Sequence, residues 1–315
     1  MSRVIRIGTA QSLGSVPGKT PSKIKKVWLE RFSVLLKEGA DKKADIISFC
    51  ECGPMHGIFD LKTNDYEYED VETGELTGFA KGQAKRLNMN IVWPTVGFYM
   101  GKLVNCAIVI SRAGKIVGVY RKTHLTYRER KEMGYMPGNE LNTFDLDFGR
   151  IGVLICHDMS FPEPWRVLAL RGAEIIFWPS HWRGWGDIYC YSVIKSRAID
   201  NSVYIAHTGY APDVSWMPGM NLARSGVFDR RGERISNAGF SVGVSVAEID
   251  LDIPDNRQSF SMGKNDDFRK WMLADRRPDL YDVITDKTLV IPTPDEEKVK
   301  TETSGKDKKK KEEKE

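Results

Sequence analysis

The sequence is short of the features that mark membrane and secreted proteins. Its 315 residues contain no run of roughly 20 uncharged apolar residues, the length that a membrane-spanning helix needs. The first residues, MSRVIRIGTAQ, lack the charged, then apolar, then small-residue pattern of a secretory signal. Hydrophobic residues still make up 41% of the chain, which is enough for a large core. We therefore expect a globular, cytoplasmic protein without a membrane partner.

Cysteine is scarce in this chain, and its count is odd. The five cysteines are Cys50, Cys52, Cys106, Cys156 and Cys190. In a large chain without a secretory signal, such a set fits free thiols in a reducing compartment better than a disulfide framework. One of these thiols is therefore a candidate nucleophile.

A strong excess of one charge is also missing. The chain has 47 basic and 43 acidic residues, and they are intermixed, which excludes the basic footprint of a nucleic-acid-binding protein. Only residues 295–315 depart from the average composition, with eight lysines, eight acidic residues and almost nothing apolar. This segment is predicted to be a disordered tail. A targeting role for the lysines at 308–311 is the less favoured alternative, because acidic neighbours offset them.

Short β-branched runs alternate with amphipathic segments from Val4 to Asp252, which predicts an α/β fold without internal repeats. Strands are predicted at 4–10, 45–49, 90–97, 105–111, 116–122, 151–155, 173–179, 202–210, 226–229 and 242–252, and helices at 20–39, 77–87, 162–170 and 189–199. Thr20 is expected to cap the first helix. These elements fit a single domain over 1–294, with an extension from about 254, followed by the tail at 295–315.

Three polar residues stand where apolar strands end: Glu51, Lys122 and Cys156. Because chemistry in α/β sheets gathers at the carboxyl ends of strands, we expect these side chains to meet in one pocket. A thiol at a strand-to-helix turn lies at the positive end of the helix macrodipole, which favours its thiolate. A nearby carboxylate can carry the thiol proton to a leaving amine, and a buried lysine supplies positive charge for a tetrahedral intermediate. The three residues therefore fit nucleophilic catalysis.

The segments VYRKTHL at 119–125 and ICHDMSFPEPWR at 155–166 resemble the nitrilase superfamily of carbon–nitrogen hydrolases. Members have a strand-end glutamate, a lysine before x-His and a cysteine before x-Asp-x-x-Phe-Pro-Glu, in this order. The resemblance implies a four-layer α-β-β-α sandwich, a homodimer or larger homo-oligomer, and an acyl-enzyme mechanism without a metal or cofactor. The implied catalytic residues are Glu51, Lys122 and Cys156, and the implied oxyanion donor is the backbone N–H of His157.

Two positions depart from the pattern of this family. Cys50 precedes Glu51 where a proline is usual, so the assignment of Glu51 rests on its strand-end context and the order of the sites. Many members also carry a second glutamate four to six residues before a Pro-Gly pair. Before Pro137-Gly138, Glu132 lies five residues away and Glu129 eight, so Glu132 is chosen, with Glu129 as the alternative. The implied role is to orient the active-site lysine and the substrate nitrogen.

Other polar residues near these motifs have competing interpretations. His124 and His157 are interpreted as hydrogen-bonded structural groups rather than bases. Cys50, Cys52 and His56 offer no convincing fourth ligand, so no metal site is predicted.

The loop after the strand at 173–179 is aromatic, and we expect it to line the substrate pocket. Trp182 and Arg183 are assigned to substrate binding, with the guanidinium facing a substrate carboxylate. For Trp178, core packing is an equal alternative.

Two further functional classes are weaker. The segment Gly239–Gly243 matches the G-x-S-x-G elbow of serine hydrolases, but that elbow needs a following helix, and residues 242–252 alternate as a strand. A non-catalytic binding scaffold is disfavoured because all three predicted site residues are present.

We therefore expect a hydrolase that cleaves the C–N bond of a small amide or N-carbamoyl compound through a thioester at Cys156. Nitrile-hydrating members of the family place a tryptophan and then a glutamate after the nucleophile, whereas His157 and Asp158 stand there in this chain. Amides rather than nitriles are therefore the expected substrates. Acyl transfer to an amine stays open, as do the acyl group and the choice between amide and N-carbamoyl compound.

Overall fold

The computed structural model describes residues 2–14, 16, 20–55, 68–181, 186–211, 224–255 and 267–289, without the side chains of 186–191 and 289. The chain divides into two compact units, Met1–Lys270 and Trp271–Glu315. The predicted tail at 295–315 lies outside the described residues.

The first sheet of the unit 1–270 has seven strands and mixed pairing, in the order β10-β1-β2-β3-β4-β5, with β12 paired to β1. Strands β1, β2 and β3 run parallel, and β3, β4 and β5 form an antiparallel meander. The bounds are β1 (Val4–Leu13), β2 (Ile46–Ser48), β3 (Asn90–Tyr99), β4 (Lys102–Ile110), β5 (Ile116–Arg121), β10 (Tyr210–Ala211) and β12 (Gly243–Asp250).

The second sheet has five strands in the order β11-β9-β8-β7-β6. Its central strands β7, β8 and β9 are parallel, and antiparallel strands close both edges. The bounds are β6 (Thr143–Leu146), β7 (Gly149–Val153), β8 (Ile175–Pro179), β9 (Tyr204–Thr208) and β11 (Gly226–Phe228). Strands β8 and β9 are buried on both faces, which explains the continuous apolar sequence of β8.

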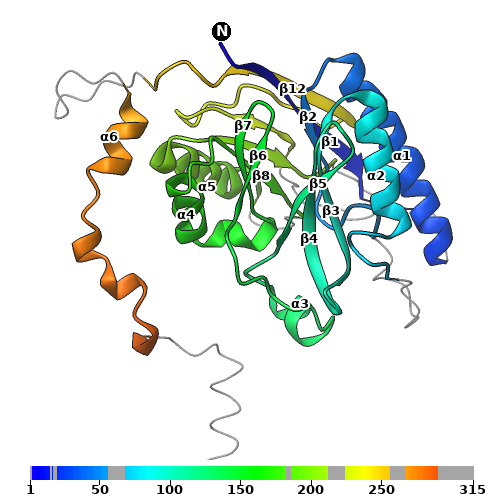
Figure 1. The fold of residues 1–315 in the computed structure, drawn as a ribbon, viewed down its shortest axis with the longest axis horizontal. Coiled ribbons are helices and arrows are strands. Elements are labelled where there is room, and N and C mark those ends of the chain that lie inside the picture. The colour runs from blue at the N-terminus through cyan, green and yellow to red at the C-terminus, as the bar shows by residue number, and fades with distance from the viewer. Residues whose placement is uncertain are drawn as a thin grey trace, which may run out of the picture. The chain divides into compact units, whose positions relative to one another are not determined.

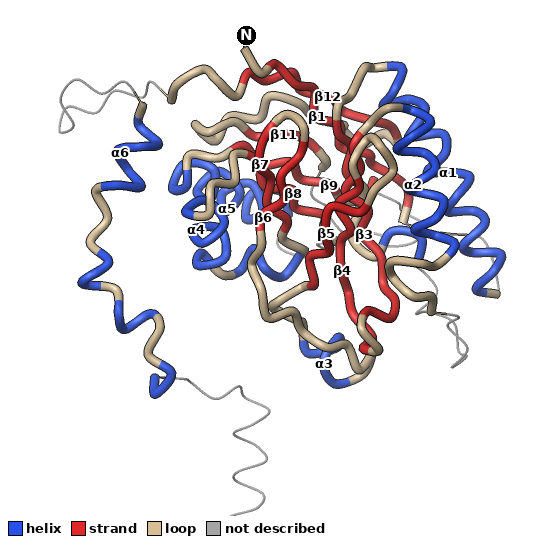
Figure 2. Tube along the Cα trace, in the orientation of Figure 1, coloured by secondary structure: helices blue, strands red, loops and turns tan. Residues whose placement is uncertain are grey.

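Helices cover the outer side of each sheet, so the unit 1–270 has four layers (Figure 1, Figure 2). On the first sheet lie α1 (Pro21–Asp41) and α2 (Glu75–Leu87), and on the side of the second lie α4 (Pro162–Leu170) and α5 (Gly186–Asn201). The predicted α-β-β-α sandwich is confirmed.

Helix α1 shows how the sequence produces this packing. Ile24, Trp28 and Phe32 recur at helical spacing, and all three are buried against the first sheet. Pro21 occupies the first turn as expected, where its missing N–H leaves no bond unmade. Thr20 stands at the N-cap position, but its side chain makes no capping hydrogen bond, so the predicted cap is wrong.

Two elements are too short to give a periodic signal in the sequence: α3 (Tyr127–Lys131) and β6. The strand expected after Ser241 is present, because β12 begins at Gly243. A serine-hydrolase elbow would need a helix at this position, so the interpretation against it is confirmed.

The described part of the C-terminal region contains short helical segments. They are α6 (Phe268–Ala274), η4 (Pro278–Leu280), η5 (Asp282–Ile284) and η6 (Lys287–Leu289). Among the helices that the structure describes, none is both long and apolar enough to span a membrane.

Candidate active site

The carboxyl ends of β2, β5 and β7 bring the predicted site residues together. Glu51 follows β2 in the chain, Lys122 follows β5, and Cys156 follows β7 and begins the short 3₁₀ helix η3 (Cys156–Ser160). His181, which follows β8, donates its backbone N–H to Glu51 Oε2 at 2.9 Å. Because β2 and β8 belong to different sheets, this bond joins the two sheets at the site.

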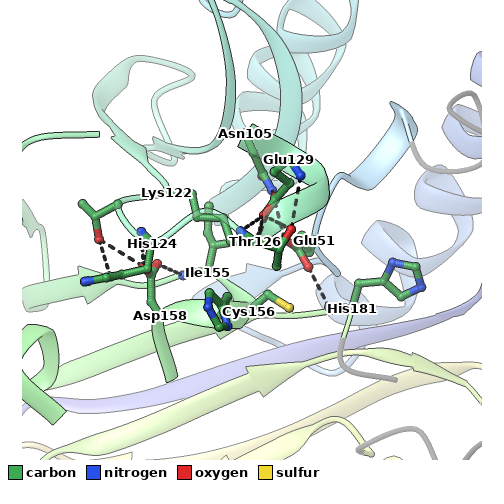
Figure 3. A network of polar contacts seen from close by, with 12 residues as sticks. Glu51, Asn105, Lys122, His124, Thr126, Glu129, Ile155, Cys156, Asp158 and His181 are labelled. Atoms are coloured by element: carbon green, nitrogen blue, oxygen red, sulfur yellow. Dashed lines mark hydrogen bonds and ion pairs between the residues drawn. The ribbon is translucent and has the colours of Figure 1, made fainter. Parts of the chain in front are cut away.

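Lys122 is the centre of a buried ionic cluster (Figure 3). Its side chain is 1% exposed, and Nζ donates to Glu51 Oε1 at 2.8 Å and to Glu129 Oε1 and Oε2 at 2.8 and 2.9 Å. Burial opposes its charge, but the negative charges of Glu51 and Glu129 and the nearby thiol Cys156 raise the pKa of Lys122 on balance. The ammonium group is therefore a fixed positive charge at the site.

The backbone at and directly after Glu51 is held in a defined conformation. The Tyr210 hydroxyl donates to the Glu51 carbonyl oxygen at 2.7 Å. The next residue, Cys52, has a φ of 63°, and Gly53 has a φ of 43°. A Cβ on Gly53 would lie 2.2 Å from the carbonyl oxygen of Pro94, so only glycine fits there. The chain therefore turns sharply after Glu51.

Cys156 occupies a strained turn. Its φ of 42° lies in the left-handed region, which residues other than glycine rarely adopt. The Trp178 indole N–H donates to the Cys156 carbonyl oxygen at 3.0 Å and holds the turn. Trp178 itself is fully buried in β8, so the core-packing alternative for this residue is correct.

The site raises the pKa of the Cys156 thiol, whereas the sequence predicted surroundings that favour its thiolate. Burial, the charge of Glu51 and a hydrogen bond with Glu51 raise the pKa of Cys156 well above its usual range, and Lys122 offsets this only in part. The helix that begins at Cys156 is only the five-residue η3, and α4 begins later, at Pro162, so the expected macrodipole is small at this point. Cys156 therefore needs a base, and the Glu51 carboxylate is its hydrogen-bond partner.

The second glutamate of the cluster is Glu129, and the choice of Glu132 is wrong. Glu132 is exposed and its nearest charged partner is Arg128, with Nε 3.4 Å from Glu132 Oε2. Glu129 is buried, and although burial opposes its ionisation, the Lys122 charge and hydrogen bonds lower its pKa. The sequence held a signal for it: Thr126 and Glu129 form a capping box for α3, and the T-x-x-E spacing predicts one.

Asp158 joins the nucleophile turn to the loop that follows Lys122. It is fully buried, and its carboxylate accepts from the Tyr120 hydroxyl, the Ile155 N–H, the Thr123 hydroxyl and the His124 N–H at 2.7 to 3.0 Å. His124 Nδ1 lies 2.8 Å from Asp158 Oδ1. Burial opposes ionisation, yet the hydrogen bonds lower the pKa of Asp158.

The remaining predicted site residues are His157, which the structure describes, and Trp182 and Arg183, which it does not. Within the described part of the chain, the His157 N–H has no hydrogen-bond acceptor, and His157 directly follows the nucleophile. Trp182 and Arg183 lie outside the described residues, as does His56. Among the described side chains, no cluster of three or more histidine, cysteine, aspartate or glutamate residues could hold a metal ion.

One site residue gives no signal in the sequence. Asn105 on β4 is buried, and its Nδ2 donates to Glu51 Oε1 at 2.9 Å and to Glu129 Oε1 at 2.8 Å (Figure 3). A single asparagine in a strand is no motif, and only the pairing of β4 with β5 places it beside Lys122.

Comparison with known proteins identifies the family. The sequence profile of the carbon-nitrogen hydrolases matches residues 22–253, which is more than half of the chain and includes all the residues in the cluster. This chain belongs to the carbon-nitrogen hydrolase family. The predicted relationship to the nitrilase superfamily is therefore confirmed.

Individual carbon-nitrogen hydrolases are similar to the chain over most of its length. The omega-amidase NIT2 of Danio rerio is 30% identical over 278 residues, which cover 83% of this chain and 93% of the relative. A nitrilase of Pyrococcus abyssi is 32% identical over 78% of this chain and 90% of its own. A mutant amidase of Nesterenkonia sp. AN1 has a similar fold, with a TM-score of 0.68 at 18% identity over 90% of this chain and 97% of its own.

Proposed function

We propose that this carbon-nitrogen hydrolase is an amidase that releases ammonia from a small linear amide or N-carbamoyl compound. The observation that carries the proposal is the Glu51 carboxylate, which contacts both the Cys156 thiol and the Lys122 ammonium group. A base, a nucleophile and a fixed positive charge thus lie in contact in a buried site.

In the proposed first half-reaction, Glu51 takes the thiol proton as Cys156 Sγ bonds to the amide carbon. The negative charge that develops on the amide oxygen is stabilised by Lys122 Nζ and by the backbone N–H of His157. When the intermediate collapses, the C–N bond breaks and Glu51 gives its proton to the leaving nitrogen. Ammonia departs, and the acyl group stays on Cys156 as a thioester.

The second half-reaction restores the enzyme. Water attacks the thioester carbon, and Glu51 takes the proton of the water. The C–S bond breaks, the sulfur is reprotonated by Glu51, and the carboxylic acid leaves. The balance is one amide and one water converted into one acid and one ammonia. Support for a nucleophilic cysteine comes from the Nesterenkonia amidase, in which the acetamide moiety of fluoroacetamide is covalently added at the active-site cysteine of a mutant.

The choice of amides over nitriles rests on the residues after the nucleophile. Asp158 is committed to five contacts that hold the turn, so its carboxylate is not free to act on a nitrile. The omega-amidase relative favours the same choice, whereas the relative named as a nitrilase favours the other. Homo-oligomer formation, a cytoplasmic location and substrate contacts by Trp182 and Arg183 stay predictions.

The test is a comparison of kcat/KM for matched substrates by ammonia release. Each set contains an amide, the nitrile and the N-carbamoyl compound on one carbon skeleton, with and without a distal carboxylate. We expect turnover of the amide or N-carbamoyl member and none with Cys156→Ala. Preference for the nitrile across skeletons would contradict the substrate assignment, and transfer to added hydroxylamine in place of hydrolysis would favour the acyl-transfer alternative.

A further inference from the structure

Asn105 lies where the two carboxylates of the site meet. Glu51 Oε1 and Glu129 Oε1 both accept from Lys122 Nζ at 2.8 Å, and both accept from Asn105 Nδ2 at 2.9 and 2.8 Å. Two acidic oxygens therefore share the same two donors. One donor is charged and the other is a neutral amide.

This arrangement has an electrostatic consequence. Two carboxylates that share a site repel each other, and such a pair tends to retain a proton between its members. A single ammonium group cannot neutralise both, so the pair has one negative charge in excess. A neutral N–H donor bonded to each oxygen favours the ionised form of both without adding a charge.

The backbone holds Asn105 in register for this task. The backbone N–H of Lys122 donates to the Asn105 carbonyl oxygen at 2.9 Å. The side chains of Asn105 and Lys122 therefore extend from neighbouring, hydrogen-bonded backbone positions. The neighbouring Cys106 is part of the core on the helical side of the sheet, and alternation along β4 directs Asn105 to the opposite face. Asn105 is 1% exposed, so water does not compete for its donors.

We propose that Asn105 is a positioning residue that joins Glu51 and Glu129 on Lys122 and keeps both carboxylates ionised, so that Glu51 is free to accept the Cys156 proton. This inference rests on the proposed amidase function. The pKa of Glu129 agrees with it: burial raises this pKa, but the Lys122 charge and the hydrogen bonds from Lys122, Thr126 and Asn105 lower it on balance. Among the described residues, the other titratable groups that interact with the two carboxylates are Cys50, Cys52, Tyr135, Cys156, His157 and Tyr210.

The test is the pH profile of kcat/KM for Asn105→Leu, which keeps the approximate volume and removes both donors. We expect the acid limb to move to higher pH by about one unit, because the carboxylate pair then holds its proton longer. Cys106→Ala, a change at an equally buried neighbour on the same strand, should leave the limb in place. Loss of activity at every pH with an unmoved acid limb would mean a merely structural role and would overturn the proposal, as would an unchanged profile.

A second variant keeps the test decisive if Asn105→Leu does not fold. Asn105→Ser retains one hydroxyl donor, and we expect its acid limb to lie between those of the parent and a donor-free site. An unmoved limb in a folded Asn105→Ser protein would contradict the proposal. Failure of the amidase function itself is distinguishable, because it would appear as missing or Cys156-independent turnover in the parent protein.

Discussion

Two buried acidic sites lie side by side in this protein, and their negative charge is stabilised in different ways. In the lysine cluster, formed by Glu51, Asn105, Lys122 and Glu129, two carboxylates share one cation. In the aspartate anchor, one carboxylate, Asp158, accepts from Tyr120, Thr123, His124 and Ile155. The lysine cluster has one more negative charge than positive charges, whereas the single carboxylate of the aspartate anchor is stabilised mainly by hydrogen bonds.

This difference in charge stabilisation suits the lysine cluster to catalysis and the aspartate anchor to holding the fold. A buried charge that is completely hydrogen-bonded resists change, which suits a residue that ties the nucleophile turn to the loop after Lys122. In the lysine cluster, by contrast, burial and the negative charge of Glu51 raise the pKa of the neighbouring Cys156 thiol, which suits a site where Glu51 acts as the base. Changes in the lysine cluster should therefore reduce turnover most, and changes in the aspartate anchor should reduce stability most.

The largest effect is expected for Lys122→Met. This change removes the positive charge from the site, and kcat/KM should fall on the order of a thousandfold or more. Steady-state ammonia release measures the loss, with Lys115→Met as the control, since Lys115 is exposed and lies directly before β5. A Lys122→Met enzyme within tenfold of the parent would remove the lysine from the mechanism.

A matched pair of glutamates tests the composition of the lysine cluster. Glu129→Gln loses a charge-assisted bond to Lys122 worth about 1.5–3 kcal/mol, so kcat/KM should fall roughly tenfold to a hundredfold. Glu132→Gln, three residues away on the exposed surface, should match the parent. The reverse ranking would restore Glu132 to the site.

Asp158→Asn, unlike the changes in the lysine cluster, should reduce stability more than activity. An amide cannot accept from all the donors around it, so we expect unfolding free energy at pH 7 to fall by about 2–3 kcal/mol, with kcat of the folded protein within roughly tenfold. Because the folded pKa of Asp158 is lowered, its contribution is present above the unfolded pKa and is lost as pH falls through the folded value. Urea unfolding measures this, and the exposed Asp145→Asn is the control. A large kcat loss without destabilisation would place Asp158 in the chemistry.

The smallest effect at neutral pH is expected at His207, which is buried outside both clusters. It packs on Trp178 and bonds Ser180, and burial lowers its pKa to about 4. The unfolded chain therefore binds a proton between about pH 6.5 and 4 that the folded chain does not, so stability should fall with decreasing pH by up to about 1.4 kcal/mol per unit there. His207→Gln should flatten that slope in urea titrations at several pH values. A slope equal to the parent's would assign the acid sensitivity to other groups.

The sequence was sufficient for part of this site because strand ends converge in an α/β fold. Glu51, Lys122 and Cys156 each end an apolar strand, and the structure does bring the three together. The four-layer sandwich followed from the motifs around Lys122 and Cys156. Helix α4 was bounded correctly because Pro162 marks its first turn.

The rest depends on contacts that no local pattern encodes. Asn105 reaches the carboxylates only because β4 pairs with β5, a tertiary fact. Spacing from Pro137 favoured Glu132, whereas the capping box of the five-residue helix α3 turns Glu129 inward. The raised pKa of the Cys156 thiol also depends on tertiary contacts, because burial and the charge of Glu51 outweigh the effect of the helix that was expected to favour a thiolate.

The central claim is that Cys156 forms a covalent acyl-enzyme with an amide. Rapid quenching during turnover, followed by intact-protein and peptide mass spectrometry, measures it directly. We predict a single acyl adduct on the Cys156 peptide, retained in Cys106→Ala and absent in Cys156→Ala together with turnover. An adduct on another residue, or ammonia release by purified Cys156→Ala at a rate near the parent's, would contradict the account.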